Sequence, residues 1–179
     1  LETTFRNKTL SSVTQAGLVN NLNDGMIWGL LPIILLQADY DSQSIGIITA
    51  VYPTVWGIGQ LFTGKMSDVY SKKALLFWGM FLQGIAILIF PFTEDFIFMV
   101  TIAFLLGVGT ALVYPTFLSA IATATNPTQR AESIGAFRFW RDSGYAIGAV
   151  LSGIIADLLG ISFAISMIGM ITLFSAVVI

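Results

Sequence analysis

The chain has 179 residues, of which 56% are hydrophobic and 10% are charged, whereas soluble globular proteins are about 45–50% apolar and about 25% charged. Because the sequence contains no histidine and no cysteine, it excludes disulfides, zinc and iron–sulfur sites and catalytic triads that use histidine. Eight basic residues against ten acidic ones leave no basic surface for nucleic acid. We expect a helical integral membrane protein that is not an enzyme and binds no metal and no cofactor.

Apolar runs separated by short polar breaks predict six membrane-spanning helices. A run of about 20 residues is long enough to cross ~30 Å of hydrocarbon. The expected spans are residues 13–37, 44–64, 73–91, 96–122, 131–157 and 161–179. Because the breaks are too short to form domains, we predict one all-α bundle over residues 1–179. The sequence begins without methionine and ends inside an apolar run, so we expect a fragment of a longer chain.

The first span carries a carboxylate near its middle. A charged Asp24 at the bilayer centre costs about 2.5–3.5 kcal/mol. Asn20 lies one turn before it and Trp28 one turn after it on the same face, and Asn21 adds a further amide. Because burial disfavours the charged form, Asp24 could carry a proton or contact a substrate on a cavity wall. The alternative is a structural hydrogen-bonding cluster that locks this helix to a neighbour.

The second and fourth spans share a tyrosine followed by a proline. The same four residues occupy positions 51–54 and 113–116, which places Tyr52 and Tyr114 directly before Pro53 and Pro115. Proline can loosen backbone groups toward a cavity in a membrane helix. Because they are polar groups at membrane depth, Tyr52 and Tyr114 are further candidates for substrate or proton binding.

The start of the fifth span carries a charged patch. Arg138, Arg141 and Asp142 are three or four residues apart or adjacent, so they lie close together on a helix. One interpretation is that the arginines extend to the membrane surface beside an intrahelical ion pair. The other is a gate pair, or an anion contact below a cavity.

Small residues recur at matching positions in the second and fifth spans. At a constant offset of 89, Gly59, Thr63, Gly64 and Asp68 correspond to Gly148, Ser152, Gly153 and Asp157. Alternating spans put the two aspartates on opposite sides of the membrane, so the two three-helix halves would be inverted repeats. The spacing at Gly59, and at Gly144, Gly148 and Ser152, also favours close helix packing.

Charge in the breaks predicts the orientation. With six alternating spans, all eight basic residues fall on one side, and the opposite breaks hold acidic residues alone. The positive-inside rule then places the N-terminus in the cytoplasm.

Residues 64–73 resemble a loop signature of the major facilitator superfamily, Gly-x-Leu-Ala-Asp-Arg-x-Gly-Arg-Lys. Four positions fit it: Gly64, Asp68, Lys72 and Lys73. Val69 and Ser71 depart from it, as is usual in the second half of that family. The glycine-rich residues 107–111 resemble the tenth helix of the family, residues 15–25 the seventh and residues 138–148 the eleventh.

This resemblance implies the C-terminal half of a twelve-helix secondary transporter, in which two halves rock around a midplane site. The first, second, fourth and fifth helices would line the pathway, and the third and sixth would face lipid. The resemblance also implies a gating role for Gly64, Asp68, Lys72 and Lys73, with Asp68 capping a helix or pairing with Arg130 or Arg141. A solvated turn that only sets the topology is the alternative.

We therefore expect half of a proton-coupled secondary transporter in a bacterial or archaeal cytoplasmic (inner) membrane. Its expected partners are the lipid bilayer, a small-molecule substrate, and the missing N-terminal half or a second copy. Two alternatives are a non-transporting scaffold or delivery module, and a six-helix protein that dimerises and transports by itself.

Overall fold

The computed structural model describes residues 2–179, which are almost entirely helical and contain no strand. Six long helices follow one another: α1 (Lys8–Gln37), α2 (Ser42–Val69), α3 (Lys72–Ile89), α4 (Phe96–Ala124), α5 (Arg130–Leu159) and α6 (Ile161–Val178). A π-helical segment, η1 (Glu2–Arg6), precedes α1, and a 3-10 turn, η2 (Phe90–Phe92), follows α3. The predicted all-α fold is confirmed.

Side-chain caps explain where several helices begin. Asn7 accepts a hydrogen bond from the Leu10 N–H at 3.1 Å, and Asp95 accepts one from the Phe98 N–H at 3.0 Å. These bonds satisfy backbone donors that have no partner within the first helical turn. Because Asn7 caps α1, this helix begins five residues before the expected span at residue 13.

The end of α2 corrects one expectation. The predicted second span ends at residue 64, but α2 continues through residues 65–69 of the expected break. Nothing in this stretch breaks a helix, and the Tyr70 N–H still bonds the Met66 carbonyl oxygen at 2.8 Å. The connection to α3 is therefore only Tyr70 and Ser71, and most of the family-like signature is helical.

Five of these helices are long and apolar enough to cross a membrane: α2, α3 with η2, α4, α5 and α6. The 30-residue α1 has the length, but the amides and the carboxylate in its middle lower its hydropathy. That α1 also spans the membrane stays a prediction.

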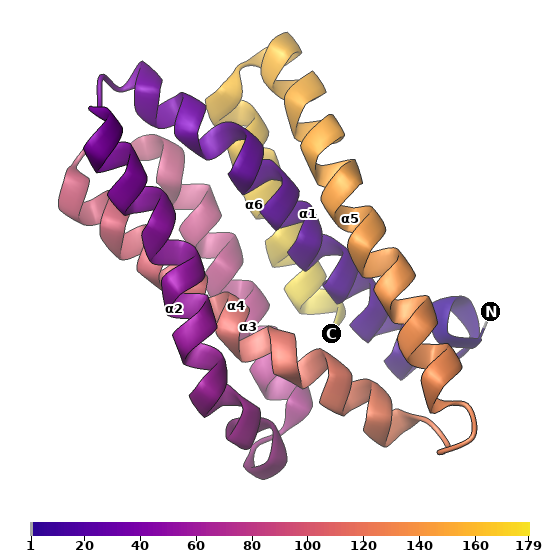
Figure 1. The fold of residues 1–179 in the computed structure, drawn as a ribbon. Coiled ribbons are helices and arrows are strands. Elements are labelled where there is room, and N and C mark those ends of the chain that lie inside the picture. The colour runs from indigo at the N-terminus through magenta and orange to yellow at the C-terminus, as the bar shows by residue number, and fades with distance from the viewer. Residues whose placement is uncertain (1) are drawn as a thin grey trace.

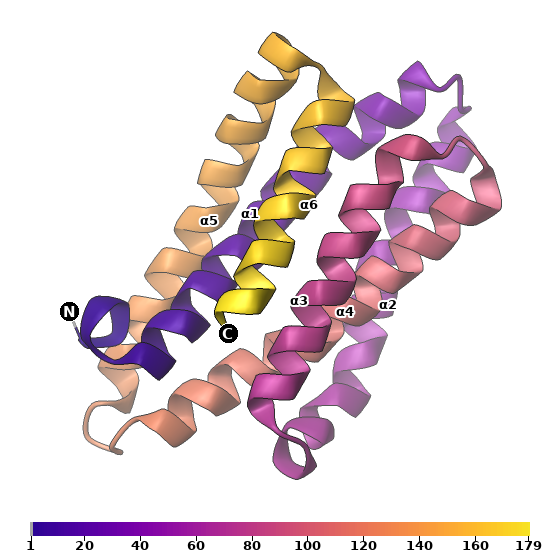
Figure 2. The same ribbon diagram turned by 180° about the vertical axis from the view of Figure 1, so that it is seen from behind.

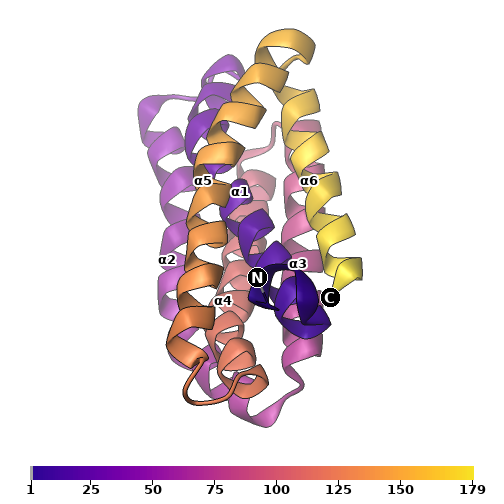
Figure 3. The ribbon, with the colours of Figure 1, turned by 90° about the vertical axis from the view of Figure 1, so that its right-hand side faces the viewer.

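The helices form two groups that pack against each other. α1 lies along α5 and α6, whereas α4 lies along α2 and α3, and α3 and α6 join the groups. In Figure 1, α2 and α5 are nearest the viewer, and α1 lies between them. The reverse view shows α3 and α6 in front (Figure 2), and the side view separates these two faces (Figure 3). α1 and α4 thus lie between the face formed by α2 and α5 and the face formed by α3 and α6.

Candidate functional site

The centre of this site is a buried carboxylate bound by a tyrosine from another helix. Asp24 lies in the middle of α1 with 9% of its surface exposed, and Tyr52 on α2 is 1% exposed. The Tyr52 hydroxyl donates a hydrogen bond to Asp24 Oδ1. Tyr52 Oη also lies 3.3 Å from Oγ1 of Thr110 on α4. The site thus joins three helices through side-chain oxygens.

Aromatic rings continue the site along α2 and α4. The Tyr52 ring lies 6.4 Å from the Trp28 ring and is stacked on Trp56 at 6.2 Å, measured between ring centres. Trp56 meets Tyr114 edge-on at 5.4 Å. The two predicted tyrosines, Tyr52 and Tyr114, therefore lie on either side of one tryptophan. The N–H group of the Trp56 indole is buried without a hydrogen-bond acceptor among the described residues.

Arg141 ends this row of rings. Its guanidinium carbon lies 5.5 Å from the centre of the Tyr114 ring, and Nη1 donates to Tyr114 Oη at 3.2 Å. Nη2 of the same side chain forms an ion pair with Asp142 Oδ1 at 2.7 Å. Asp142 thus forms its ion pair with Arg141. Arg138, one turn earlier on the helix, is exposed instead.

The asparagines of α1 divide between two faces of that helix. Asn20 is buried, and its Nδ2 donates to Asn21 Oδ1 at 3.5 Å. Asn23 instead donates to Gln83 Oε1 on α3 at 3.2 Å and accepts a hydrogen bond from Thr172 Oγ1 on α6 at 2.7 Å. One face of α1 is thus fixed to α3 and α6, and the face with Asn20 and Asp24 lies toward α2 and α4.

The predicted gating residues at the basic end do not form the expected pairs. Asp68 is exposed, and within residues 2–179 the only ion pair is the one between Arg141 and Asp142. Arg130 donates to the Ala122 carbonyl oxygen at 3.0 Å instead. Gly64 faces open space, and Lys72 and Lys73 form the first turn of α3. The expected pairing of Asp68 with Arg130 or Arg141 is absent from this arrangement.

The predicted packing residues lie where two pairs of helices approach closely. A Cβ atom at Gly59 would lie 2.7 Å from Ala111 Cβ. At Gly144 and Gly148 on α5, it would lie 2.1 and 2.2 Å from carbonyl oxygens of α1. Ser152 is buried one turn further along α5. These glycines let α2 approach α4 and α5 approach α1.

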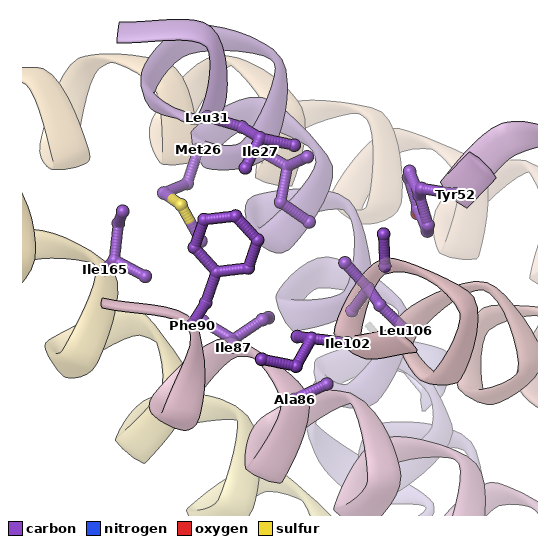
Figure 4. A pocket seen from close by; sticks show the side chains of 11 residues that line it. Met26, Ile27, Leu31, Tyr52, Ala86, Ile87, Phe90, Ile102, Leu106 and Ile165 are labelled. Carbon is purple, nitrogen blue, oxygen red and sulfur yellow. The ribbon is translucent and has the colours of Figure 1, made fainter. Parts of the chain in front are cut away.

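A small apolar pocket adjoins Tyr52. Its volume is about 20 Å³, and its walls come from α1, α2, α3, η2, α4 and α6. Tyr52 lies at one side and Ile165 at the other, with Phe90 between them (Figure 4). Because its other walls are apolar, a water molecule inside would lack the two to four polar partners that it needs.

Two residues of this site were missing from the sequence prediction. Thr110 lies in the glycine-rich stretch of α4, and Trp56 lies one turn after Tyr52 on α2. The one feature of the sequence that could have indicated Thr110 is its hydroxyl group within an otherwise apolar helix. The sequence does not show which face of α4 meets Tyr52, so this signal was not decisive.

Comparison with known proteins identifies the family of the chain. The family model described as Major Facilitator Superfamily matches residues 14–179. An uncharacterised MFS-type transporter of Methanocaldococcus jannaschii is 26% identical over 157 residues, covering 88% of this chain and 41% of that protein. The quinolone resistance protein NorA of Staphylococcus aureus is 22% identical over 136 residues, covering 76% of this chain and 35% of NorA. The chain spans about two fifths of the length of such relatives. It belongs to the major facilitator superfamily.

Proposed function

We propose that the chain is half of a secondary active transporter, which moves a small solute by alternating access and couples this movement to a proton on Asp24. The observation that carries the proposal is the buried Asp24 carboxyl group, bound by Tyr52 midway along α1. Ionisable groups at membrane depth are costly and mark substrate or proton pathways. Asn20, Asn21, Trp28 and Tyr114 would complete the binding surface. No covalent step is involved, so the chain is not an enzyme in this proposal.

The proposed partner is a second six-helix half, supplied by a longer chain or by a second copy. Support comes from the relatives, which are more than twice as long as the matched segments. Large apolar side chains are exposed on α2 and α5: Ile58, Leu61, Phe62, Phe139, Val150 and Ile154. A second half would cover part of this surface, and lipid would cover the rest.

The proposed gate lies between Asp24 and the basic end of the bundle. The ion pair of Arg141 with Asp142 is held to α4 through Tyr114, so a movement of α5 relative to α4 would break that contact. Arg138, Gly64, Asp68, Lys72 and Lys73 would act nearer the membrane surface. The Asp68 carboxylate is exposed and therefore accessible to a basic side chain of the second half.

We place the protein in a bacterial or archaeal cytoplasmic membrane with the N-terminus inside. Its relatives come from an archaeon and a bacterium. The basic residues lie in the N-terminal segment, at the facing ends of α2 and α3, and in the first half of α5. The positive-inside rule favours the cytoplasmic side for all three.

The decisive experiment replaces Asp24 with asparagine, which keeps the shape of the side chain but holds no proton. We expect Asp24→Asn to reduce pH-gradient-driven transport in proteoliposomes to the level of empty vesicles, with an unchanged amount of protein in the membrane. A quinolone is the first solute to test, because one relative is a quinolone resistance protein. Asp157→Asn is the matched control, since Asp157 is exposed at the end of α5.

Wild-type rates in Asp24→Asn would remove this carboxyl group from the mechanism. An equal loss in Asp157→Asn would show that the effect is not specific to the site. Transport that continues without a pH gradient would leave a transporter that is not proton-coupled.

A further inference from the structure

The hydroxyl groups of Tyr52 and Thr110 extend the Asp24 contact into a chain of hydrogen bonds. Either of these two hydroxyl groups can donate to the other across their 3.3 Å separation. Thr110 Oγ1 also lies 3.1 Å from the Leu106 carbonyl oxygen of its own helix. The exposed fractions are 9% for Asp24, 1% for Tyr52 and 0% for Thr110. Since these groups are shielded from solvent, each hydroxyl proton needs an acceptor within the chain.

When Asp24 is ionised, its carboxylate is the acceptor that the Tyr52 hydroxyl proton needs. The single hydroxyl proton of Tyr52 goes to the carboxylate, which forms a charge-assisted hydrogen bond. Thr110 then donates either to Tyr52 Oη or to the Leu106 carbonyl oxygen. The hydroxyl group of Thr110 is therefore not needed as an acceptor in this form.

Protonation of Asp24 at Oδ1, the oxygen that Tyr52 contacts, needs the opposite arrangement. The proton on Oδ1 is donated to Tyr52 Oη, and the Tyr52 proton then rotates toward another acceptor. Thr110 Oγ1 is that acceptor, and Thr110 donates its own proton to the Leu106 carbonyl oxygen. The hydrogen bond between Asp24 and Tyr52 reverses its direction, and no donor loses its acceptor.

We propose that Thr110 is a positioning residue for the proton of Asp24, because it accepts the Tyr52 hydroxyl proton when Asp24 is protonated. This inference rests on the proposed role of Asp24 as the proton-binding site. One proton is added at Asp24 Oδ1, the Tyr52 hydroxyl group rotates, and no other covalent bond forms or breaks. Thr110 thereby lets the carboxyl group become neutral without leaving an unsatisfied hydroxyl group beside it.

Other titratable groups on the helices around α1 must be kept constant in a test. α6 carries none, and those of α3 are Lys72 and Lys73 at its beginning. On α2, α4 and α5, the groups nearest to this depth are Tyr52, Tyr114, Arg141, Asp142 and Tyr145. The side-chain hydrogen bonds of Arg141 go to Asp142 and Tyr114, and none goes to Thr110. Substitution at Thr110 therefore changes the hydrogen-bond chain and leaves these charges in place.

Removal of the Thr110 hydroxyl group and removal of the Tyr52 hydroxyl group should have opposite effects on the protonation of Asp24. Thr110→Val removes the acceptor that only the protonated form needs, and it preserves the side-chain shape. Tyr52→Phe removes the charge-assisted hydrogen bond that favours the ionised form. We expect the proton concentration at which Asp24 is half protonated to rise about tenfold in Thr110→Val and to fall in Tyr52→Phe.

Infrared spectroscopy of the purified protein in lipid nanodiscs measures this directly. The stretching band of the protonated Asp24 carboxyl group is assigned as the band lost in Asp24→Asn, and its intensity is followed against pH. Thr116→Val is the matched control, because Thr116 is a buried threonine of α4 whose hydroxyl group bonds its own helix at 2.7 Å. Thr110→Ser should restore the wild-type titration.

An unchanged titration in Thr110→Val, or shifts of the same direction in Thr110→Val and Tyr52→Phe, would overturn the inference. If Thr110→Val does not fold, Thr110→Ala and Thr110→Ser differ by the hydroxyl group alone, and the shift must occur only in Thr110→Ala. A wild-type protein without a titrating Asp24 band would also overturn it. Because the titration needs no solute, a failure of transport with the expected shifts would count against the proposed function alone.

Discussion

At the scale of single residues, one methyl group would be enough to separate two helices of this bundle. A Cβ atom at Gly144 would lie 2.1 Å from the Leu18 carbonyl oxygen. Since this atom belongs to the backbone of α1, it cannot move without moving the helix. The contact between α1 and α5 therefore depends on the absence of a side chain at this position.

We expect Gly144→Ala to lower the free energy of unfolding by about 1–3 kcal/mol, because overpacking forces backbone shifts. Thermal or denaturant unfolding of the protein in detergent would measure this change. Gly135→Ala on the same helix is the control, since no atom lies within 4 Å of a Cβ at that position. Equal stability of the two variants would contradict the close approach of α1 and α5.

The residues of the site differ in how far the sequence could reveal them. Asp24 could be found because a carboxylate is rare in the middle of a long apolar run. The partnership of Tyr52 with Asp24 could not, because it depends on how α1 and α2 are rotated about their axes. Asn23 was grouped with its neighbours in the sequence, yet its hydrogen bonds with Gln83 and Thr172 place it on another face.

At the scale of helices, the beginning of α2 depends on a carboxylate that titrates. Hydrogen bonds from the side chain and the backbone N–H of Ser44 lower the pKa of Asp41 below its ordinary value of 3.8. Asp41 precedes α2 and lies outside the spanning segment. Because the pKa of Asp41 is lowered in the folded state, the ionised carboxylate stabilises the fold fully when the pH is above the ordinary pKa. This stabilisation is lost as the pH falls through the lowered pKa.

We expect the first turn of α2 to open more often as the pH falls below this range. Hydrogen exchange at the Ser44 and Ile45 amides would report this opening. Asparagine is an equally good N-cap and does not titrate, so Asp41→Asn should keep the turn and remove its dependence on pH. An identical pH dependence in Asp41→Asn would show that another group is responsible.

The helix contacts follow the same pattern in the two three-helix halves, whereas their inversion stays a prediction. Exchanging α1 with α4, α2 with α5 and α3 with α6 converts the packing of α1 on α5 and α6 into that of α4 on α2 and α3. The matched positions behave alike: a side chain at Gly59 or Gly148 would meet the neighbouring helix, whereas Gly64 and Gly153 face open space. Helix boundaries were harder to predict, because the polar and charged residues at the end of α2 are typical of a loop although they are helical.

At the scale of the whole molecule, the absence of native cysteine makes the topology directly testable. We expect Asp68→Cys to react with a membrane-impermeant maleimide only from the cytoplasmic side and Asp157→Cys only from the opposite side. Both residues are exposed at helix ends, so neither depends on opening of the bundle. Labelling of both from one side would contradict the proposed topology of the spans between them.

A further consequence of the bundle concerns the order in which its parts become available during synthesis. Among the six long helices, α1 is made first, and it lacks the continuous apolar stretch that the other five have. Its most extensive contact is with α5, which is made more than 90 residues later. The translocon must therefore retain α1, or lipid must tolerate its amides, until the late helices arrive. Truncation before α5 would leave α1 as the segment most accessible to quality-control proteases.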